Sequence, residues 1–152
     1  MKKILLTITS LTLLSCSSEL SCSDENFPNP DTTTSNLIGV WKMERTVTVS
    51  GSDQTTVIST YLPDACKSNS TYEFKSNGAY IAKDYNMVGT ECKFSEVNKS
   101  YTYDSSTQKL VMGNMESKVL ALTANKLVVF VNDNYDSNND GISDYLKYTF
   151  IK

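Results

Sequence analysis

The chain contains no histidine among its 152 residues. This absence excludes the Ser-His and Cys-His pairs of nucleophilic enzymes, and it excludes His-ligated zinc. A hydrolytic enzyme would have to rely on carboxylates, Lys or Tyr, and no pair of such groups has a spacing that indicates a catalytic site. We therefore expect a protein that is not an enzyme.

Runs of basic residues are also missing. The chain has 14 Lys and Arg against 17 Asp and Glu, a formal net charge of −3. A protein that binds nucleic acid needs a basic face from which counterions are released. We expect no nucleic-acid partner.

The chain also lacks an apolar run of the roughly 20 residues that a membrane-spanning helix needs. A shorter apolar run follows Lys2 and Lys3 and ends in LLSC at residues 13–16. A cationic start, an apolar stretch of about a dozen residues and a small-residue cleavage site are typical of a secretory signal. The LLSC tetrapeptide resembles the bacterial lipobox, whose Cys becomes the lipidated first residue of the mature chain. We predict that residues 1–15 are a lipoprotein signal peptide and that Cys16 carries the lipid.

Cys22 is the alternative lipidation site, because Ser21 precedes it. In that case Glu19 would lie three residues before the cut, where an apolar residue is favoured. This argument favours Cys16 as the anchor.

Residues 16–36 are predicted to be a flexible linker. They contain two of the three prolines and almost nothing apolar, so burial cannot offset the entropy cost of ordering them. Within them, the acidic stretch at residues 23–25 resembles signals of surface-exposed lipoproteins, although an ordinary solvated linker explains it equally well. The mature chain of 137 residues has 12 basic and 17 acidic side chains, a net charge of −5, and is long enough for one domain at residues 37–152.

Short alternating segments rich in Val, Thr, Tyr and Phe predict an all-β domain. In the first, residues 40–49, Trp41, Met43, Val47 and Val49 fall on one face. Asn77 and Gly78 give the strongest hairpin signal. The other strands are expected at residues 57–61, 72–75, 79–83, 101–103, 110–112, 118–122, 126–131 and 145–151. Strands at this spacing fit a small antiparallel up-and-down barrel of about eight to ten strands.

Cys66 and Cys92 lie inside the predicted domain, each at the edge of an expected strand. Export to an oxidising compartment permits a disulfide. We predict that the two are bonded to each other; the alternative is two buried free thiols.

The domain resembles the lipocalin-like domains of Gram-negative outer-membrane lipoproteins. The resemblance rests on Leu37, Gly39 and Trp41, which match an LxGxW strand entry, on YEFKSNGAY at residues 72–80, and on the two flanking cysteines. It covers residues 37–152, although the second and third short motifs of true lipocalins are not evident. It implies a barrel in which Gly39 lets the chain bend, Trp41 closes the bottom and the cysteines bridge.

The resemblance and the export signal together predict a function. We expect a monomer, anchored by its N-terminal lipid to the outer membrane and exposed at the surface, that binds a small apolar or amphipathic molecule. The alternative is a structural or adhesive module with a filled barrel, whose partner is a protein or a glycan.

One segment suggests metal binding. In DSNNDGISD, oxygen donors from Asp136, Asn138, Asp140 and Asp144, with the carbonyl of Ile142, can converge on Ca²⁺ after the turn at Gly141. The run resembles the calcium loop of thrombospondin type 3 repeats and the first half of an EF-hand loop, but it lacks the bidentate Glu. A dissociation constant of roughly 0.1 to 1 mM is then expected. The alternative is a long exposed turn, which collects the same residue types.

Overall fold

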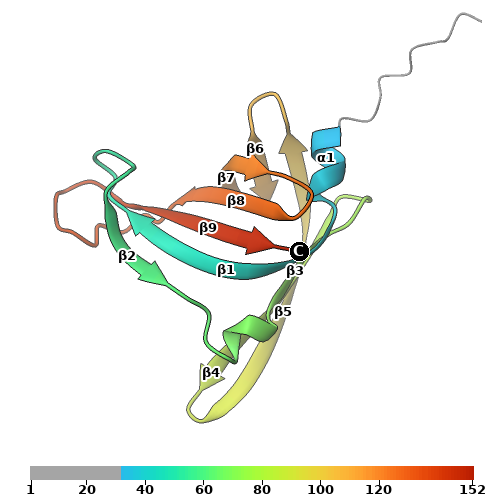
Figure 1. The fold of residues 1–152 in the computed structure, drawn as a ribbon, viewed down its shortest axis with the longest axis horizontal. Helices are drawn as coiled ribbons and strands as arrows, with labels where there is room; N and C mark the ends of the chain where they lie inside the picture. The colour runs from blue at the N-terminus through green and yellow to red at the C-terminus, as the bar shows by residue number, and fades with distance from the viewer. Residues whose placement is uncertain (1–31) are drawn as a thin grey trace, which may run out of the picture.

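Nine antiparallel strands form one sheet that closes on itself (Figure 1). The computed structural model describes residues 32–152. In chain order the elements are α1 (Thr32–Leu37), β1 (Gly39–Val49), β2 (Val57–Tyr61), the 3-10 turn η1 (Lys67–Asn69), β3 (Thr71–Phe74), β4 (Ala79–Val88), β5 (Glu91–Asp104), β6 (Lys109–Met112), β7 (Met115–Leu122), β8 (Lys126–Asn132) and β9 (Tyr145–Ile151). β1 pairs with both β3 and β9, so β1 and β3 to β9 make a closed eight-stranded barrel. β2 is an extra strand beside the second half of β1. The all-β, up-and-down prediction is confirmed.

The hairpin predicted at Asn77 and Gly78 joins β3 to β4, with Gly78 at a φ of 81°. β5 differs from the prediction because it begins at Glu91 rather than at Tyr101. The segment 91–100 is exposed at every position and mixes polar with apolar residues on both faces. It therefore lacks the period-2 pattern from which strands are recognised in a sequence.

A β-bulge in β1 changes which of its side chains point into the barrel. The register with β9 shifts between Met43 and Arg45, so that Glu44 is the additional residue. Beyond the bulge, Thr46 and Thr48 pair with inward-facing residues of β9 and line the same pocket as Met43. Val47 and Val49 are buried, but both lie outside the core cluster. The prediction that all four apolar residues of β1 share a face was wrong, because alternation does not continue through a bulge.

The barrel is closed at the end where β1 begins. Trp41 is completely buried, and its indole nitrogen donates a hydrogen bond of 2.8 Å to the carbonyl oxygen of Leu37. The ammonium of Lys152 lies 4.4 Å from the centre of the Trp41 ring and donates to the carbonyls of Asn36 and Ile38. Gly39 has a φ of 132°, and a β-carbon there would lie 3.0 Å from the Lys152 side chain. The first and last described segments are thus joined at one end.

Helix α1 occupies residues that the sequence assigned to the linker. Its six residues are too few for a helix that is stable alone, so its packing has to hold it in place. Leu37, its last residue, is completely buried and belongs to the core cluster. Among residues 32–152, no helix is long and apolar enough to cross a membrane.

Candidate functional site

A cavity of about 280 Å³ lies inside the barrel. Its lining is mainly apolar and comes from seven strands and from η1. The aromatic lining residues are Tyr72, Phe74, Tyr80, Tyr148 and Phe150; the aliphatic and sulfur-containing ones are Met43, Ala82, Met112, Met115, Leu127, Val129 and Val131; the charged ones are Lys67 and Asp84. The core therefore does not fill the whole interior, and the remaining space suits a small apolar group.

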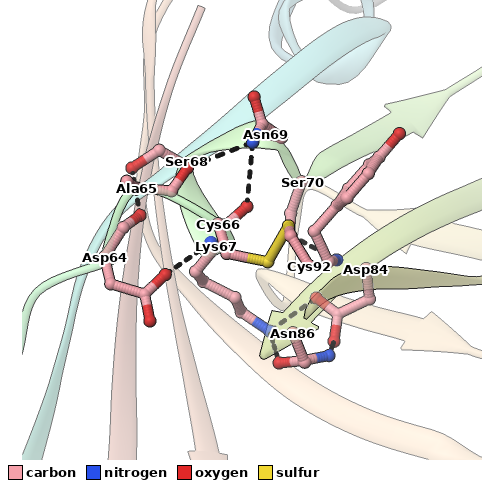
Figure 2. Close-up of a disulfide and its surroundings, with 11 residues drawn as sticks. Asp64, Ala65, Cys66, Lys67, Ser68, Asn69, Ser70, Asp84, Asn86 and Cys92 are labelled. Atoms are coloured by element: carbon pink, nitrogen blue, oxygen red, sulfur yellow. Dashed lines mark hydrogen bonds and ion pairs between the residues drawn. A yellow bond between two sulfur atoms is a disulfide. The ribbon is translucent and has the colours of Figure 1, made fainter. Parts of the chain in front are cut away.

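The two charged residues of the lining form one polar cluster with Tyr72 and Asn86. The ammonium of Lys67 lies 2.6 Å from Asp84 Oδ1 and 3.2 Å from Asn86 Oδ1. The hydroxyl of Tyr72 donates to Asp84 Oδ1 at 2.9 Å, and the amide of Asn86 donates to Asp84 Oδ2 at 2.8 Å. Figure 2 shows Lys67 reaching from η1 to Asp84 and Asn86 on β4. We call these four residues the polar cluster.

Burial and hydrogen bonding act in opposite directions on Asp84. Burial raises the pKa of its carboxyl, but hydrogen bonds from Lys67, Asn86 and Tyr72 outweigh that effect and leave the pKa below its ordinary value. The charge of the Asp84 carboxylate also contributes to the raised pKa values of two tyrosines in the lining. Burial, and then the charge of Asp84, raises the pKa of Tyr80 to about 12, and burial raises the pKa of Tyr148, with smaller contributions from Asp133 and Asp84. At neutral pH Asp84 is ionised and both phenols keep their protons.

A disulfide between Cys66 and Cys92 holds η1 beside β4 and β5 (Figure 2), which confirms the predicted pairing. Its Cα atoms are 5.5 Å apart, and its dihedral angle is 89°. The buried hydroxyl of Ser70, just after η1, also accepts a hydrogen bond of 2.8 Å from the backbone nitrogen of Tyr85. Because Lys67 follows Cys66 directly, both contacts help to place its ammonium over the cavity.

A shallower pocket adjoins the cavity at the end opposite Trp41. The two share Met43, Lys67 and Tyr148, and the shallower one adds Thr46, Thr48, Tyr61, Asn86 and Leu146. These residues come from the ends of β1, β4 and β9 that are farthest from the closed end, and from β2. We call this pocket the mouth of the barrel.

The loop predicted to bind calcium is packed against the β1–β2 turn. The carboxylate of Asp144 is completely buried and accepts hydrogen bonds from the backbone nitrogens of Gly51, at 3.1 Å, and Ser137, at 2.6 Å. Asp140 Oδ2 accepts from the hydroxyl of Ser50 at 3.2 Å. Close approach requires Gly51, because a β-carbon there would overlap the carbonyl of Ser143.

The other loop donors are used within the loop. The carboxylate of Asp136 accepts from the backbone nitrogens of Asp140 and Gly141, and Asn138 Oδ1 accepts from that of Asp140. The backbone nitrogen of Ile142 donates to Asp140 Oδ1, and this bond is the main reason why the pKa of Asp140 is lowered. In residues 32–152 no group of three or more Cys, Asp or Glu side chains is placed to hold a metal ion. Calcium binding stays a prediction.

Two predicted sites lie outside the described residues. These are the lipidation site at Cys16 and its alternative at Cys22. The signal peptide at residues 1–15 and most of the predicted linker lie there as well. Sequence reasoning missed Lys67, Asp84 and Asn86, because a single Lys before a turn and two polar residues in a strand carry no motif; only the fold brings them together.

Both the sequence and the fold resemble those of known proteins. The model of the lipocalin-like domain family matches residues 37–129. No curated protein sequence matches significantly. Among solved structures, the bovine lipocalin allergen Bos d 2 is similar at 13% identity and a TM-score of 0.44, covering 78% of this chain and 73% of the allergen. A deswapped triple mutant of bovine odorant-binding protein is similar at 14% identity and a TM-score of 0.41, covering 77% and 74%.

The family match includes the closed end at Trp41, both cysteines and the strands that supply most of the cavity lining. It covers more than half of the chain, and the observed topology is that of a closed antiparallel barrel. The chain belongs to the lipocalin-like domain family.

Proposed function

We propose that this protein binds a small apolar or amphipathic molecule inside its barrel and does not act as an enzyme. The observation that carries the proposal is the cavity of about 280 Å³ with a lining that is mostly aromatic and aliphatic. Transfer of an apolar group from water into such a space is favourable by about 25 cal/mol for each Å² removed from water. The same space argues against the alternative of a barrel filled by its own side chains.

The size of the cavity limits the ligand. Ligand pockets in proteins commonly measure about 300 to 1,000 Å³. The cavity lies just below this range, so its occupant is small, and a longer molecule would extend into the mouth. The adjoining pocket supports this arrangement, because Met43, Lys67 and Tyr148 line both spaces.

Binding can be tested with the fluorescent probe N-phenyl-1-naphthylamine. We expect saturable fluorescence enhancement with the wild-type domain and loss of most of it with Ala82→Phe. Ala82 is buried and lines the cavity, so a phenyl ring there occupies the ligand space. Lys83→Phe is the matched control, because Lys83 is exposed and pairs with Glu96 outside the lining. Equal probe binding by wild type and Ala82→Phe would contradict the proposal.

The proposal includes anchoring of the exported chain to the outer membrane, with the domain at the cell surface. Its support is the lipobox-like LLSC at residues 13–16 and the polar sequence that follows it. Metabolic labelling with an alkyne fatty acid in a Gram-negative host tests the lipid. We expect labelling of wild type and of Cys22→Ala but not of Cys16→Ala. If Cys16→Ala is labelled and Cys22→Ala is not, the anchor is Cys22. Protease accessibility on intact cells tests surface exposure.

A further inference from the structure

We propose that the cavity selects apolar molecules that carry one neutral hydrogen-bond acceptor, such as a ketone, over carboxylates of the same chain length. This inference rests on the proposed function and names the class of ligand. The geometry that carries it is a set of three hydrogen-bond donors without a protein acceptor, which share the cavity with the Lys67–Asp84 ion pair.

The donors belong to Lys67, Tyr80 and Tyr148, which all line the cavity. An ammonium has three N–H donors, and the protein atoms around Lys67 accept two of them, at Asp84 and at Asn86. Within residues 32–152, the hydroxyls of Tyr80 and Tyr148 have no protein partner, whereas the hydroxyl of Tyr72 donates to Asp84. Tyr80 and Tyr148 line the same cavity as Lys67 and Asp84, and Tyr148 also lines the mouth together with Lys67.

The two phenols retain their protons at neutral pH, since burial raises the pKa of each. No buried side-chain donor or acceptor in residues 32–152 lacks a partner, so the hydroxyls of Tyr80 and Tyr148 are open to water in the cavity. A ligand without an acceptor that displaced this water would leave the donors without a partner, which is costly in an apolar space. A ligand that presents an acceptor to this region therefore gains a hydrogen bond that a pure hydrocarbon cannot form. The rest of the lining is apolar and favours a hydrocarbon body.

Charge favours a neutral acceptor over an anion. The carboxylate of Asp84 lies 2.6 Å from the ammonium of Lys67, so the pair has no net charge to attract a carboxylate. A ligand anion that reached Lys67 would lie close to the carboxylate of Asp84 and would lose its hydration in an apolar space. A cation is disfavoured too, because Lys67 would repel it and Asp84 already accepts three hydrogen bonds.

Competition experiments with the bound probe test the selectivity. The probe N-phenyl-1-naphthylamine is bound first and then titrated at pH 7.5 with decan-2-one or with decanoate. The three proteins compared are wild type, the double variant Tyr80→Phe/Tyr148→Phe and the control Tyr85→Phe. Tyr85 packs its ring on Phe94 and does not line the cavity. We expect wild type and Tyr85→Phe to prefer the ketone by about tenfold or more. Relative to its own affinity for the probe, the double variant should bind the ketone roughly tenfold more weakly than wild type does, as expected for one or two lost hydrogen bonds.

The outcomes separate the two proposals. Saturable probe binding with equal or stronger displacement by decanoate overturns the selectivity and leaves the ligand-binding function standing. Unchanged ketone affinity in the double variant overturns the role of the two phenols. A wild-type domain that does not bind the probe at all overturns both.

Discussion

The ammonium of Lys67 lies 2.6 Å from the carboxylate of Asp84 and so connects η1 to β4 between the cavity and its mouth. The Lys67 side chain is only 15% exposed and that of Asp84 31%, so water screens the pair less than it screens an ion pair on the open surface. Removing the ammonium leaves Asp84 with the two weaker donors, Tyr72 and Asn86.

Lys67→Met should therefore lower the free energy of unfolding by about 1 to 2 kcal/mol, because a partly buried carboxylate loses its charged partner. Urea denaturation followed by tryptophan fluorescence measures this, with Trp41 as the single reporter. Lys93→Met is the control, because its ion pair with Glu91 is exposed at both ends. Equal effects of the two substitutions would show that the partly buried Lys67–Asp84 pair stabilises the fold no more than an exposed ion pair does.

Low pH should reduce the free energy of unfolding, in part because Asp84 becomes protonated. Its folded pKa is lowered, so its contribution to stability is fully present above the ordinary carboxyl pKa near 4 and is lost as pH falls through the folded value. The difference in unfolding free energy between wild type and Asp84→Asn should be largest near pH 6 and should narrow toward pH 3. Asp53 and Asp104, whose side-chain and backbone hydrogen bonds lower their pKa to about 2, remain in both proteins and cancel in the comparison. A constant difference from pH 6 to pH 3 would contradict this assignment.

The Cys66–Cys92 disulfide closes a loop with a sequence separation of 26 residues. On the chain-entropy model, its loss in Cys66→Ala/Cys92→Ala should lower the free energy of unfolding by about 3 to 4 kcal/mol. Reductant should destabilise wild type to the same extent and leave the double variant unchanged. The variant should also bind the probe more weakly, since Lys67 loses its anchored neighbour. A stability that does not respond to reductant would argue against the bridge.

Gly51 and Asp144 join the two long connections beyond the mouth. Gly51→Ala should destabilise the fold because a β-carbon there overlaps the carbonyl of Ser143, and Asp144→Ala should cost roughly 2 to 3 kcal/mol through two lost hydrogen bonds in a buried site. If the carboxylate acts only by holding Gly51, the double variant should cost less than the sum of the two single changes. Fully additive effects would show that the two residues act independently.

Calcium binding by the loop of Asp136, Asn138, Asp140, Ile142 and Asp144 is tested by calorimetric titration. The sequence predicts weak binding, roughly 0.1 to 1 mM, that is lost in Asp140→Ala. Each carboxylate in this loop now accepts hydrogen bonds from the chain itself, so binding would require the loop to rearrange. Identical heats for wild type and variant would end the calcium hypothesis and leave the loop with a structural role.

The barrel could be predicted from sequence because most of its strands alternate cleanly and its clearest turn is Asn77–Gly78. Two features escaped prediction for local reasons. The bulge at Glu44 reverses the facing of the second half of β1, and the exposed first part of β5 has no apolar face. The polar cluster escaped prediction because Lys67 and Asp84 are 17 residues apart in the chain and lie side by side only through the β3–β4 pairing and the disulfide.

Lys152 hydrogen-bonds to Asn36 and Ile38, so both ends of the described chain meet beneath Trp41. A molecule attached through residue 152 would therefore be held by its base, with the opening turned away from the support. Sensor surfaces or beads coupled at residue 152 should leave access to the interior unobstructed. A tether that enters the domain at Thr32 would likewise join it through α1, whose last residue packs at the closed end, and would not cover the opening.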